Sequence, residues 1–262
     1  TKLSKVWNVI KNLNNKGKSS SLPALEKENG QFAKTDFEKA NVLGKHYAKI
    51  SSTSNYDDNF KKHKRVFERK NANIFCHRSN TCSVLNVPFK MGEFRKALKK
   101  CKNTSPGKDR LSYIMFKHMS AHSQEIVLKY YNRIWEKGYI PKIWRHALVI
   151  PVLKPNKPKS DPASYRPIAL NSNFCKLMEK MIVNRMNWFL EKYNLLNNFQ
   201  SGFRKSRNTI DQLLRFSDTI LKSLGNKSFV LAVFFDLEAY DMVWRKAVLY
   251  KLHKRFVKVA CN

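Results

Sequence analysis

An aspartate that follows a long apolar run has the clearest potential for chemistry in this sequence. Phe229 to Phe235 is unbroken and rich in Val and Phe, and Asp236 comes directly after it. Such a run is typical of a strand buried on both faces in the middle of a sheet. A carboxylate at the end of a buried strand is costly unless it is paired or holds a metal. Because Mg²⁺ prefers carboxylate oxygens together with substrate phosphates, Asp236 is a candidate metal ligand; a local capping role is the alternative.

The charge balance predicts the class of partner. The chain has 51 Lys and Arg against 19 Asp and Glu, a formal net charge of +32. Such a charge makes the folded chain repel itself, and a polyanion relieves that repulsion. Nucleic acid is therefore the leading candidate partner, and an anionic membrane surface is the weaker one. No apolar run approaches the roughly 20 residues that cross a bilayer, and no secretory signal is visible, so an intracellular place, in the nucleus or the cytoplasm, is expected.

Smaller clusters leave alternatives open. Cys76 and His77 lie near Cys82, but a second pair of ligands at zinc-finger spacing is missing. The odd number of cysteines, 5, fits reduced thiols in an intracellular compartment. A basic cluster in the first third of the chain is either a solvated face or a set of phosphate contacts. Its members are Lys61, Lys62, Lys64, Arg65, Arg69 and Lys70.

The apolar periodicity predicts several helices and one hairpin. Helices are expected near residues 3–10, 40–47, 94–101, 126–135, 174–196, 209–225 and 243–252. Gly138 and Pro141 close the fourth of them, and Thr209 with Gln212 predicts a capping box that opens the helix ended by Gly225. Residues 144–153 and 165–170 are expected to be paired strands, joined by a lysine-rich connection.

Six short blocks in a fixed order identify a resemblance. They are Ser105-Pro106-Gly107-Lys108-Asp109, Pro141-x-x-Trp144, Pro151-Val-Leu-Lys154, Tyr165-Arg166-Pro167-Ile168, Gln200-Ser-Gly-Phe-Arg204, and Phe235-Asp236-Leu-Glu with Tyr240-Asp241-x-Val243-Trp244. In this order they resemble the reverse transcriptases of jockey-type non-LTR retrotransposons, over about residues 89–252. Each block alone is a weak signal, and their succession makes the resemblance specific.

The resemblance implies a helix-rich, mixed α/β right-hand polymerase. It places a basic connector at residues 1–88, the fingers with their hairpin at 89–200, and the start of the palm with one central strand at 201–262. The implied activity is RNA-directed DNA synthesis from dNTPs on an RNA template with a DNA primer. In this family two metal ions, normally Mg²⁺, activate the primer 3′-hydroxyl and stabilise the leaving pyrophosphate.

The resemblance also implies roles for individual residues. Asp236 matches the first catalytic, metal-binding carboxylate. Lys154 and Arg166 match cations that bind the incoming triphosphate, and Tyr240 matches the aromatic gate that excludes a 2′-hydroxyl. The remaining matched residues are expected to contact the template or the nucleotide. These are Gln200, Gly202, Phe203 and Arg204.

Two departures bear on activity. The family pattern is Asp-x-x-Lys-Ala-aromatic-Asp, whereas Asp236 is followed by Leu-Glu-Ala-Tyr-Asp, one residue fewer. One helical residue is a rise of about 1.5 Å and a turn of about 100°, so the direction of Tyr240 is in question. The family's Tyr-x-Asp-Asp hairpin is also absent from these residues, and Tyr56-Asp57-Asp58 has the wrong spacing and place. We therefore expect this chain alone to be inactive; a non-enzymatic basic nucleic-acid-binding protein is the alternative.

Overall fold

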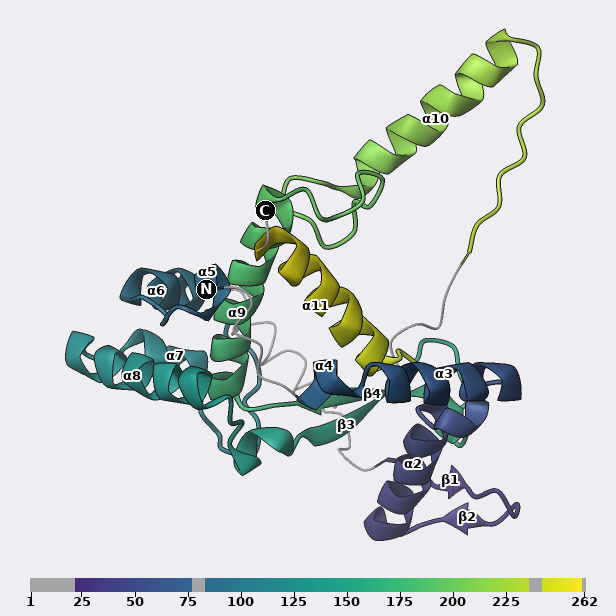
Figure 1. Cartoon of the computed structure of the whole chain (residues 1–262). Coiled ribbons are helices and arrows are strands. Elements are labelled where there is room, and N and C mark those ends of the chain that lie inside the picture. The colour runs from purple at the N-terminus through teal and green to yellow at the C-terminus, as the bar shows by residue number, and fades with distance from the viewer. Residues whose placement is uncertain (1–21, 77–82, 236–241, 261–262) are drawn as a thin grey trace, which may run out of the picture. The chain divides into compact units, whose positions relative to one another are not determined.

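The computed structural model describes residues 22–76, 83–235 and 242–260, and Figure 1 shows their helices and strands. The described chain divides into two compact units, one drawn from residues 1–57 with 148–170 and the other from 58–147 with 171–262. The domain boundaries after residues 88 and 200 rest on the sequence resemblance and stay predictions.

The first unit joins an N-terminal segment to the predicted hairpin. Its elements are β1 (Leu25–Glu26), β2 (Phe32–Ala33), α2 (Asp36–Ile50), the 3₁₀ turns η1 (Thr53–Asn55) and η3 (Pro162–Ser164), β3 (Leu148–Leu153) and β4 (Tyr165–Leu170). Leu25, Ala33, Leu43 and Tyr165 form its buried core. The backbone N–H of Glu26 also donates to the carbonyl of Ser160, at 2.9 Å. Residues predicted to be only a connector therefore pack against the hairpin.

The hairpin tolerates two prolines because of its register. β3 and β4 are antiparallel, with Pro151 opposite Pro167 and Leu153 opposite Tyr165. The N–H of Lys154 donates to the carbonyl of Ser164 at 2.8 Å, which sets the alternation of bonded and non-bonded pairs. The two prolines then fall on a non-bonded pair, where no ladder N–H is needed. The hairpin prediction is confirmed, although the first strand begins at Leu148 and not at residue 144.

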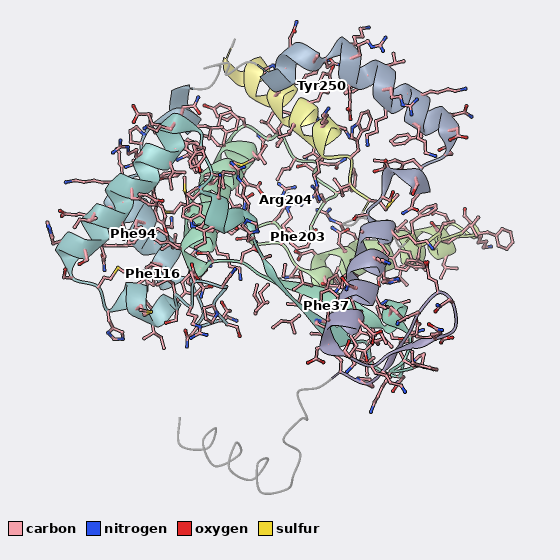
Figure 2. All side chains as sticks on the ribbon, turned by 90° about the horizontal axis from the view of Figure 1, so that it is seen from below. Phe37, Phe94, Phe116, Phe203, Arg204 and Tyr250 are labelled. Atoms are coloured by element: carbon pink, nitrogen blue, oxygen red, sulfur yellow. The ribbon has the colours of Figure 1, made fainter. Side chains whose placement is uncertain are left out.

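All the regular secondary structure in the described part of the second unit is helical. Its elements are α3 (Asp58–Lys70), α4 (Ala72–Cys76), α5 (Ser83–Asn86), α6 (Met91–Lys99), α7 (Tyr113–Lys117), α8 (Ala121–Lys137), η2 (Lys142–Arg145), α9 (Asn173–Lys192), α10 (Thr209–Gly225) and α11 (Arg245–Ala260). Phe94, Phe116, Tyr131 and Met181 are buried where α6, α7, α8 and α9 meet, and Phe94 and Phe116 are marked in Figure 2. The apolar stripe predicted for residues 174–196 is this core face of α9.

The helix ends follow local chemistry with one difference. Gly138 ends α8 in the left-handed conformation, with φ of 59°, and α10 stops at Gly225 as expected. The capping box of α10 is one residue earlier than predicted. Asn208 accepts from the N–H of Asp211, and the Asp211 carboxylate accepts from the N–H of Asn208. Asparagine is at least as good a cap as threonine, and the Thr209 assignment was wrong.

The central strand predicted at residues 229–235 is not formed. The segment has no regular secondary structure, and its apolar side chains are exposed, by 105% for Phe229, 90% for Leu231 and 85% for Phe235. A strand needs a neighbour for its N–H and C=O groups. Among the described residues, β1 pairs with β2 and β3 pairs with β4, and these are the only strands. The 229–235 segment therefore has no partner strand, and its apolar composition alone does not make it a strand. The predicted helix at 3–10 and the Cys82 region lie outside the described residues.

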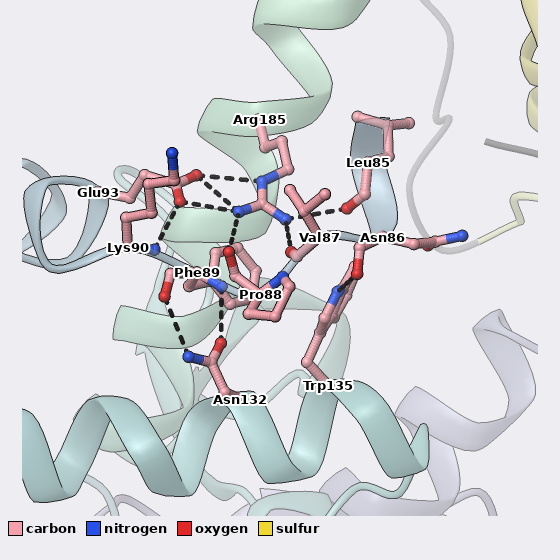
Figure 3. Close-up of polar contacts among 10 residues, drawn as sticks. All are labelled: Leu85, Asn86, Val87, Pro88, Phe89, Lys90, Glu93, Asn132, Trp135 and Arg185. Carbon is pink, nitrogen blue, oxygen red and sulfur yellow. Dashed lines mark hydrogen bonds and ion pairs between the residues drawn. The ribbon is translucent and has the colours of Figure 1, made fainter. Parts of the chain in front are cut away.

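Arg185 fixes α9 to the chain segment that precedes α6 (Figure 3). Its guanidinium donates to the Glu93 carboxylate from Nε at 3.1 Å and from Nη2 at 2.8 Å. It also donates to the carbonyls of Leu85, at 2.9 Å, and of Val87. The guanidinium carbon lies 4.1 Å from the ring centroid of Phe89. One buried side chain thus satisfies a carbonyl of α5 and one of the loop that joins α5 to α6.

Candidate functional site

The β3–β4 hairpin presents the two predicted triphosphate-binding cations together. Val152 pairs with Arg166, and Lys154 is two residues beyond Val152, so Lys154 and Arg166 leave the same face of the ribbon as diagonal neighbours. Lys154 Nζ donates to the carbonyl of Ala163 at 2.9 Å, and Arg166 is exposed. Leu153 and Tyr165 face the opposite way, into the core of the first unit. At its loop end the hairpin thus has one face packed into the core and one cationic face.

An apolar strip continues this cationic face along the strands. Its members lie at every second position of the strands, on one face, and are between about two-fifths and just over half exposed. They are Leu148, Ile150, Val152 and Ile168, with exposed fractions of 54%, 41%, 46% and 44%. The face is therefore charged at its loop end and apolar along its length. Sequence reasoning missed this division, because each strand is apolar at nearly every position and so carries no alternation.

Arg204 is held by an ion pair within the chain. Its Nε donates to Glu191 Oε1 at 2.9 Å and its Nη2 to Oε2 at 2.7 Å. The Arg204 side chain is only 7% exposed. The hydrogen bond from Arg204 lowers the pKa of Glu191, and the same bond raises the pKa of the guanidinium. This two-pronged geometry is the strong form of the pair.

The same guanidinium shapes the loop that carries the other matched residues. Arg204 Nη1 donates to the carbonyls of Asn197, at 2.8 Å, and of Gln200, at 3.3 Å. Phe203 is left 93% exposed with a φ of 60°, which is rare for a residue with a bulky side chain. Phe203 and Arg204 are marked in Figure 2. A Cβ added at Gly202 would meet nothing within 4 Å, so crowding does not explain that glycine.

Glu191 is a functional candidate that the sequence analysis missed. It lies in the last turn of α9, next to Lys192, where the helix dipole disfavours a negative charge. An acidic residue in the last turn of a helix was the signal in the sequence. It indicates that a cation from another segment lies beside Glu191 and neutralises its charge. The contacts of Arg204 with Glu191 and with two loop carbonyls therefore hold the 200–204 loop in place.

Breaking this pair is expected to loosen the loop and lower stability. Arg204→Ala and Glu191→Ala should each destabilise the second unit, and in urea unfolding the double variant should cost less than the sum of the two single variants. Because the pKa of Glu191 is lowered on folding, its contribution is present above the ordinary carboxyl pKa and is lost as the pH falls through the folded value. Additive effects at neutral pH would show that the pair is not coupled.

The predicted metal ligand and the aromatic gate, Asp236 and Tyr240, lie outside the described residues. No group of three or more His, Cys, Asp or Glu within residues 22–76, 83–235 and 242–260 could hold a metal ion. The shared pocket of Asp236 with Lys154 and Arg166 therefore stays a prediction. No helix in the described ranges is both long enough and apolar enough to span a membrane.

Comparison with known proteins connects these elements to one family. Residues 155–260 match the family described as reverse transcriptase (RNA-dependent DNA polymerase). Over 171 residues the chain is 33% identical to the probable RNA-directed DNA polymerase from transposon BS of Drosophila melanogaster, covering 64% of this chain and 19% of the relative. The chain is homologous to jockey-type reverse transcriptases. The matched stretch contains Arg166, the 200–204 loop and Asp236, and it begins directly after Lys154.

Two jockey reverse transcriptases extend the comparison. The chain is 31% identical over 153 residues to the RNA-directed DNA polymerase from mobile element jockey of Drosophila melanogaster, covering 58% of this chain and 17% of the relative. To the jockey protein of Drosophila funebris it is 27% identical over 260 residues, 94% of this chain and 26% of the relative. The chain therefore spans between about a sixth and a quarter of these relatives, and the jockey similarity extends into its N-terminal part.

Proposed function

We propose that this chain supplies the fingers and the first palm segment of an RNA-directed DNA polymerase. Its substrates would be an RNA template, a DNA primer and dNTPs. The observation that carries the proposal is the placement of Lys154 and Arg166 on one face of the hairpin, at the start of the stretch that matches reverse transcriptases. Arginine offers a planar fork to phosphate oxygens and lysine a mobile point charge. The apolar strip beside them suits the less polar parts of a nucleotide.

The 200–204 loop would contact the template or the nucleotide through residues that Arg204 positions. The exposed Phe203 ring offers a face on which a base can stack, an interaction worth about 1–3 kcal/mol per base. Gln200 and Gly202 would contribute a side-chain amide and accessible backbone. Arg204 contacts Glu191 and the loop carbonyls, so its role would be to orient the loop residues that contact the template or the nucleotide.

Asp236 would hold Mg²⁺, whose chemistry in this family is activation of the primer 3′-hydroxyl and stabilisation of pyrophosphate. Tyr240 would discriminate against a 2′-hydroxyl, subject to the shorter turn between the two residues. Only Asp236 matches a catalytic carboxylate among these residues, and two metals need several oxygen ligands. We therefore expect the 262-residue chain to bind a nucleotide without extending a primer.

Nucleotide binding by calorimetry tests the proposal. The Lys154→Ala/Arg166→Ala variant should bind dNTP with Mg²⁺ on the order of 100-fold more weakly, because two charge-assisted contacts of about 1.5 kcal/mol each are lost. The Lys157→Ala/Lys159→Ala variant removes the same charge from the connection between the strands and should retain affinity. Asp236→Asn should abolish the part of the affinity that depends on Mg²⁺. Equal weakening by both double variants would show a charge effect alone and contradict the proposal.

The net charge of +32 favours one other function, that of a basic nucleic-acid-binding protein without enzymatic chemistry. Such a protein would bind RNA with a steep salt dependence. It would show no preference for dNTP over the ribonucleotide, and Asp236→Asn would leave its nucleotide binding unchanged. The same calorimetric series therefore separates the two functions.

A further inference from the structure

A cavity of about 790 Å³ lies within the second unit, beside the C-terminal end of α8. Helix α9 contributes Cys175, Met178, Glu179 and Ile182 to its lining. These four residues recur at helical spacing and so share one face of α9. Most of the remaining lining comes from the end of α8 and from the segment that follows it. A cavity of this size accommodates a small organic molecule.

Aromatic side chains form much of the cavity lining. Trp135 donates its indole N–H to the carbonyl of Asn86 at 3.3 Å, which fixes the ring (Figure 3). Trp144 is only 9% exposed and meets the Phe174 ring edge-on, with centroids 5.6 Å apart. Tyr139 is 50% exposed and remains accessible. Fixed aromatic surfaces of this kind suit a ligand with an apolar, aromatic body.

Two carboxylates also line the cavity, although the chain as a whole has a net charge of +32. They belong to Glu136 and Glu179, and both residues are exposed. Within residues 22–76, 83–235 and 242–260, neither carboxylate forms an ion pair. Glu179 accepts a weak hydrogen bond from Cys175 Sγ, at 3.5 Å. Both carboxylates are therefore accessible to a cation that enters the cavity.

The other ionisable groups of the lining leave its charge negative. Burial raises the pKa of the Cys175 thiol to about 12, so this group is neutral. Arg145 is the cation that lines the cavity. Its Nε donates to the carbonyl of Ile140 at 3.2 Å, and its guanidinium carbon lies 5.8 Å from the Tyr139 ring centroid. Two carboxylates and one guanidinium give the described lining a formal charge of −1.

The end of α8 adds to this negative potential. The helix stops at Lys137, and Gly138 follows in the left-handed conformation. A helix C-terminus carries a partial negative charge, which disfavours a carboxylate in the last turn. Glu136 has that place in α8, as Glu191 has in α9. Arg204 neutralises Glu191, and a cation in the cavity would do the same for Glu136.

We propose that this cavity binds a small organic cation with an aromatic body. The aromatic side chains of the lining contact the body of the ligand, while Glu136 and Glu179 neutralise its charge. A cation near the face of Trp or Tyr is attracted further by the ring electrons. A nucleotide does not suit the cavity, because its phosphates would meet the two carboxylates. The site is thus separate from the proposed contacts with dNTP and template.

Three probes with one aromatic body test the charge preference of the full chain by saturation-transfer NMR. They are naphthylmethylammonium, neutral naphthylmethanol and anionic naphthoate. The cation should bind with a dissociation constant of about 1 mM or below, as expected for so small a ligand. The alcohol should bind roughly tenfold more weakly, and the anion more weakly still. The net charge of the chain alone would favour the anion, so the reverse order isolates the cavity.

Removal of the two carboxylates tests their role. Glu136→Gln/Glu179→Gln should bind naphthylmethylammonium roughly tenfold more weakly, the scale of contacts at exposed carboxylates, and should bind the alcohol as before. The control Glu125→Gln/Asp218→Asn removes the same charge from exposed positions on α8 and α10 and should keep the affinity for the cation. Equal losses in the two double variants, or equal affinity for all three probes, would overturn the proposal.

Two isoleucines test the location of the site. Ile140 and Ile143 are each 55% exposed, and of the two Ile140 lines the cavity. Ile140→Ala should weaken the cation and the alcohol alike, by roughly threefold to tenfold, because apolar contact is lost. Ile143→Ala should change neither. Circular dichroism confirms that each variant is folded, and dNTP calorimetry should give unchanged affinity. Binding of the cation that is insensitive to Ile140→Ala would place it elsewhere and refute the site.

Discussion

The Arg185→Ala variant should lose about 3–5 kcal/mol of unfolding free energy, the usual cost of removing one partner of a buried ion pair. The Arg185 side chain is only 8% exposed and that of Glu93 34%. Its loss leaves the carbonyls of Leu85 and Val87 without this donor and leaves the Glu93 carboxylate with only the N–H of Lys90 as a donor among the described residues. Leu85 is in the short helix α5 and Val87 in the loop after it, so these carbonyls have no strand ladder to replace the lost bonds. Urea denaturation followed by circular dichroism measures the effect.

Two further substitutions show which property of Arg185 matters. Arg185→Lys keeps the charge but loses the planar fork, so it should recover only part of the stability. Lys192→Ala removes an exposed cation from the same helix, one that lies 4.8 Å from the ring centroid of Trp188, and should change stability by no more than about 0.5 kcal/mol. If alanine at 185 costs less than about 1 kcal/mol, the contacts in Figure 3 do not hold α9 to the loop.

Gly107→Ala should also destabilise the second unit, by about 1–3 kcal/mol or more, as overpacking does. A Cβ at Gly107 would lie 2.7 Å from the carbonyl carbon of Asn171 and 2.7 Å from the nitrogen of Ser172. Both are backbone atoms at the N-terminus of α9, where Ser172 caps the helix. Because backbone cannot swing aside, one segment must move. The glycine of the Ser105–Asp109 block is therefore a packing requirement, which the turn signal alone did not reveal.

Gly92→Ala is the matched control for this substitution. It lies in α6 of the same unit, where an added Cβ meets nothing within 4 Å, and alanine is the better helix former. Its stability should be unchanged or slightly raised in the same urea titration. Equal midpoints for the two variants would refute the close approach at Gly107. A shift at position 107 alone would confirm it.

The helices and the hairpin could be predicted from the sequence because each depends on residues that are close together along the chain. The apolar spacing that predicted helices at 94–101, 126–135 and 174–196 matches α6, α8 and α9, because these helices bury one stripe each in a common core. The hairpin was also predictable, since turn residues separate two apolar runs of similar length. Gly138 ends α8 because glycine adopts the left-handed conformation without strain. This helix end could therefore be predicted from the local sequence alone.

Long-range contacts could not be inferred in the same way. Phe229 to Phe235 has the composition of a buried strand, yet strand formation depends on partners that composition does not specify. The bonds from Arg204 to Glu191, and from Arg185 to Glu93, join residues whose spacing carries no motif. Tyr240 followed from the family resemblance alone, whereas Asp236 was also indicated by the apolar run before it. Their geometry depends on a turn that differs from the family pattern by one residue.

The first unit is made of two segments that are separated in the sequence, so the ribosome synthesises them at different times. Its chain departs after Asp57 and returns at Leu148, so Leu25, Ala33 and Leu43 emerge long before Tyr165 closes their core. At about 5–20 residues per second, the roughly 90 intervening residues delay that closure by some 5–20 seconds. During this interval the apolar side chains of the nascent N-terminal segment lack the hairpin residue that completes their core.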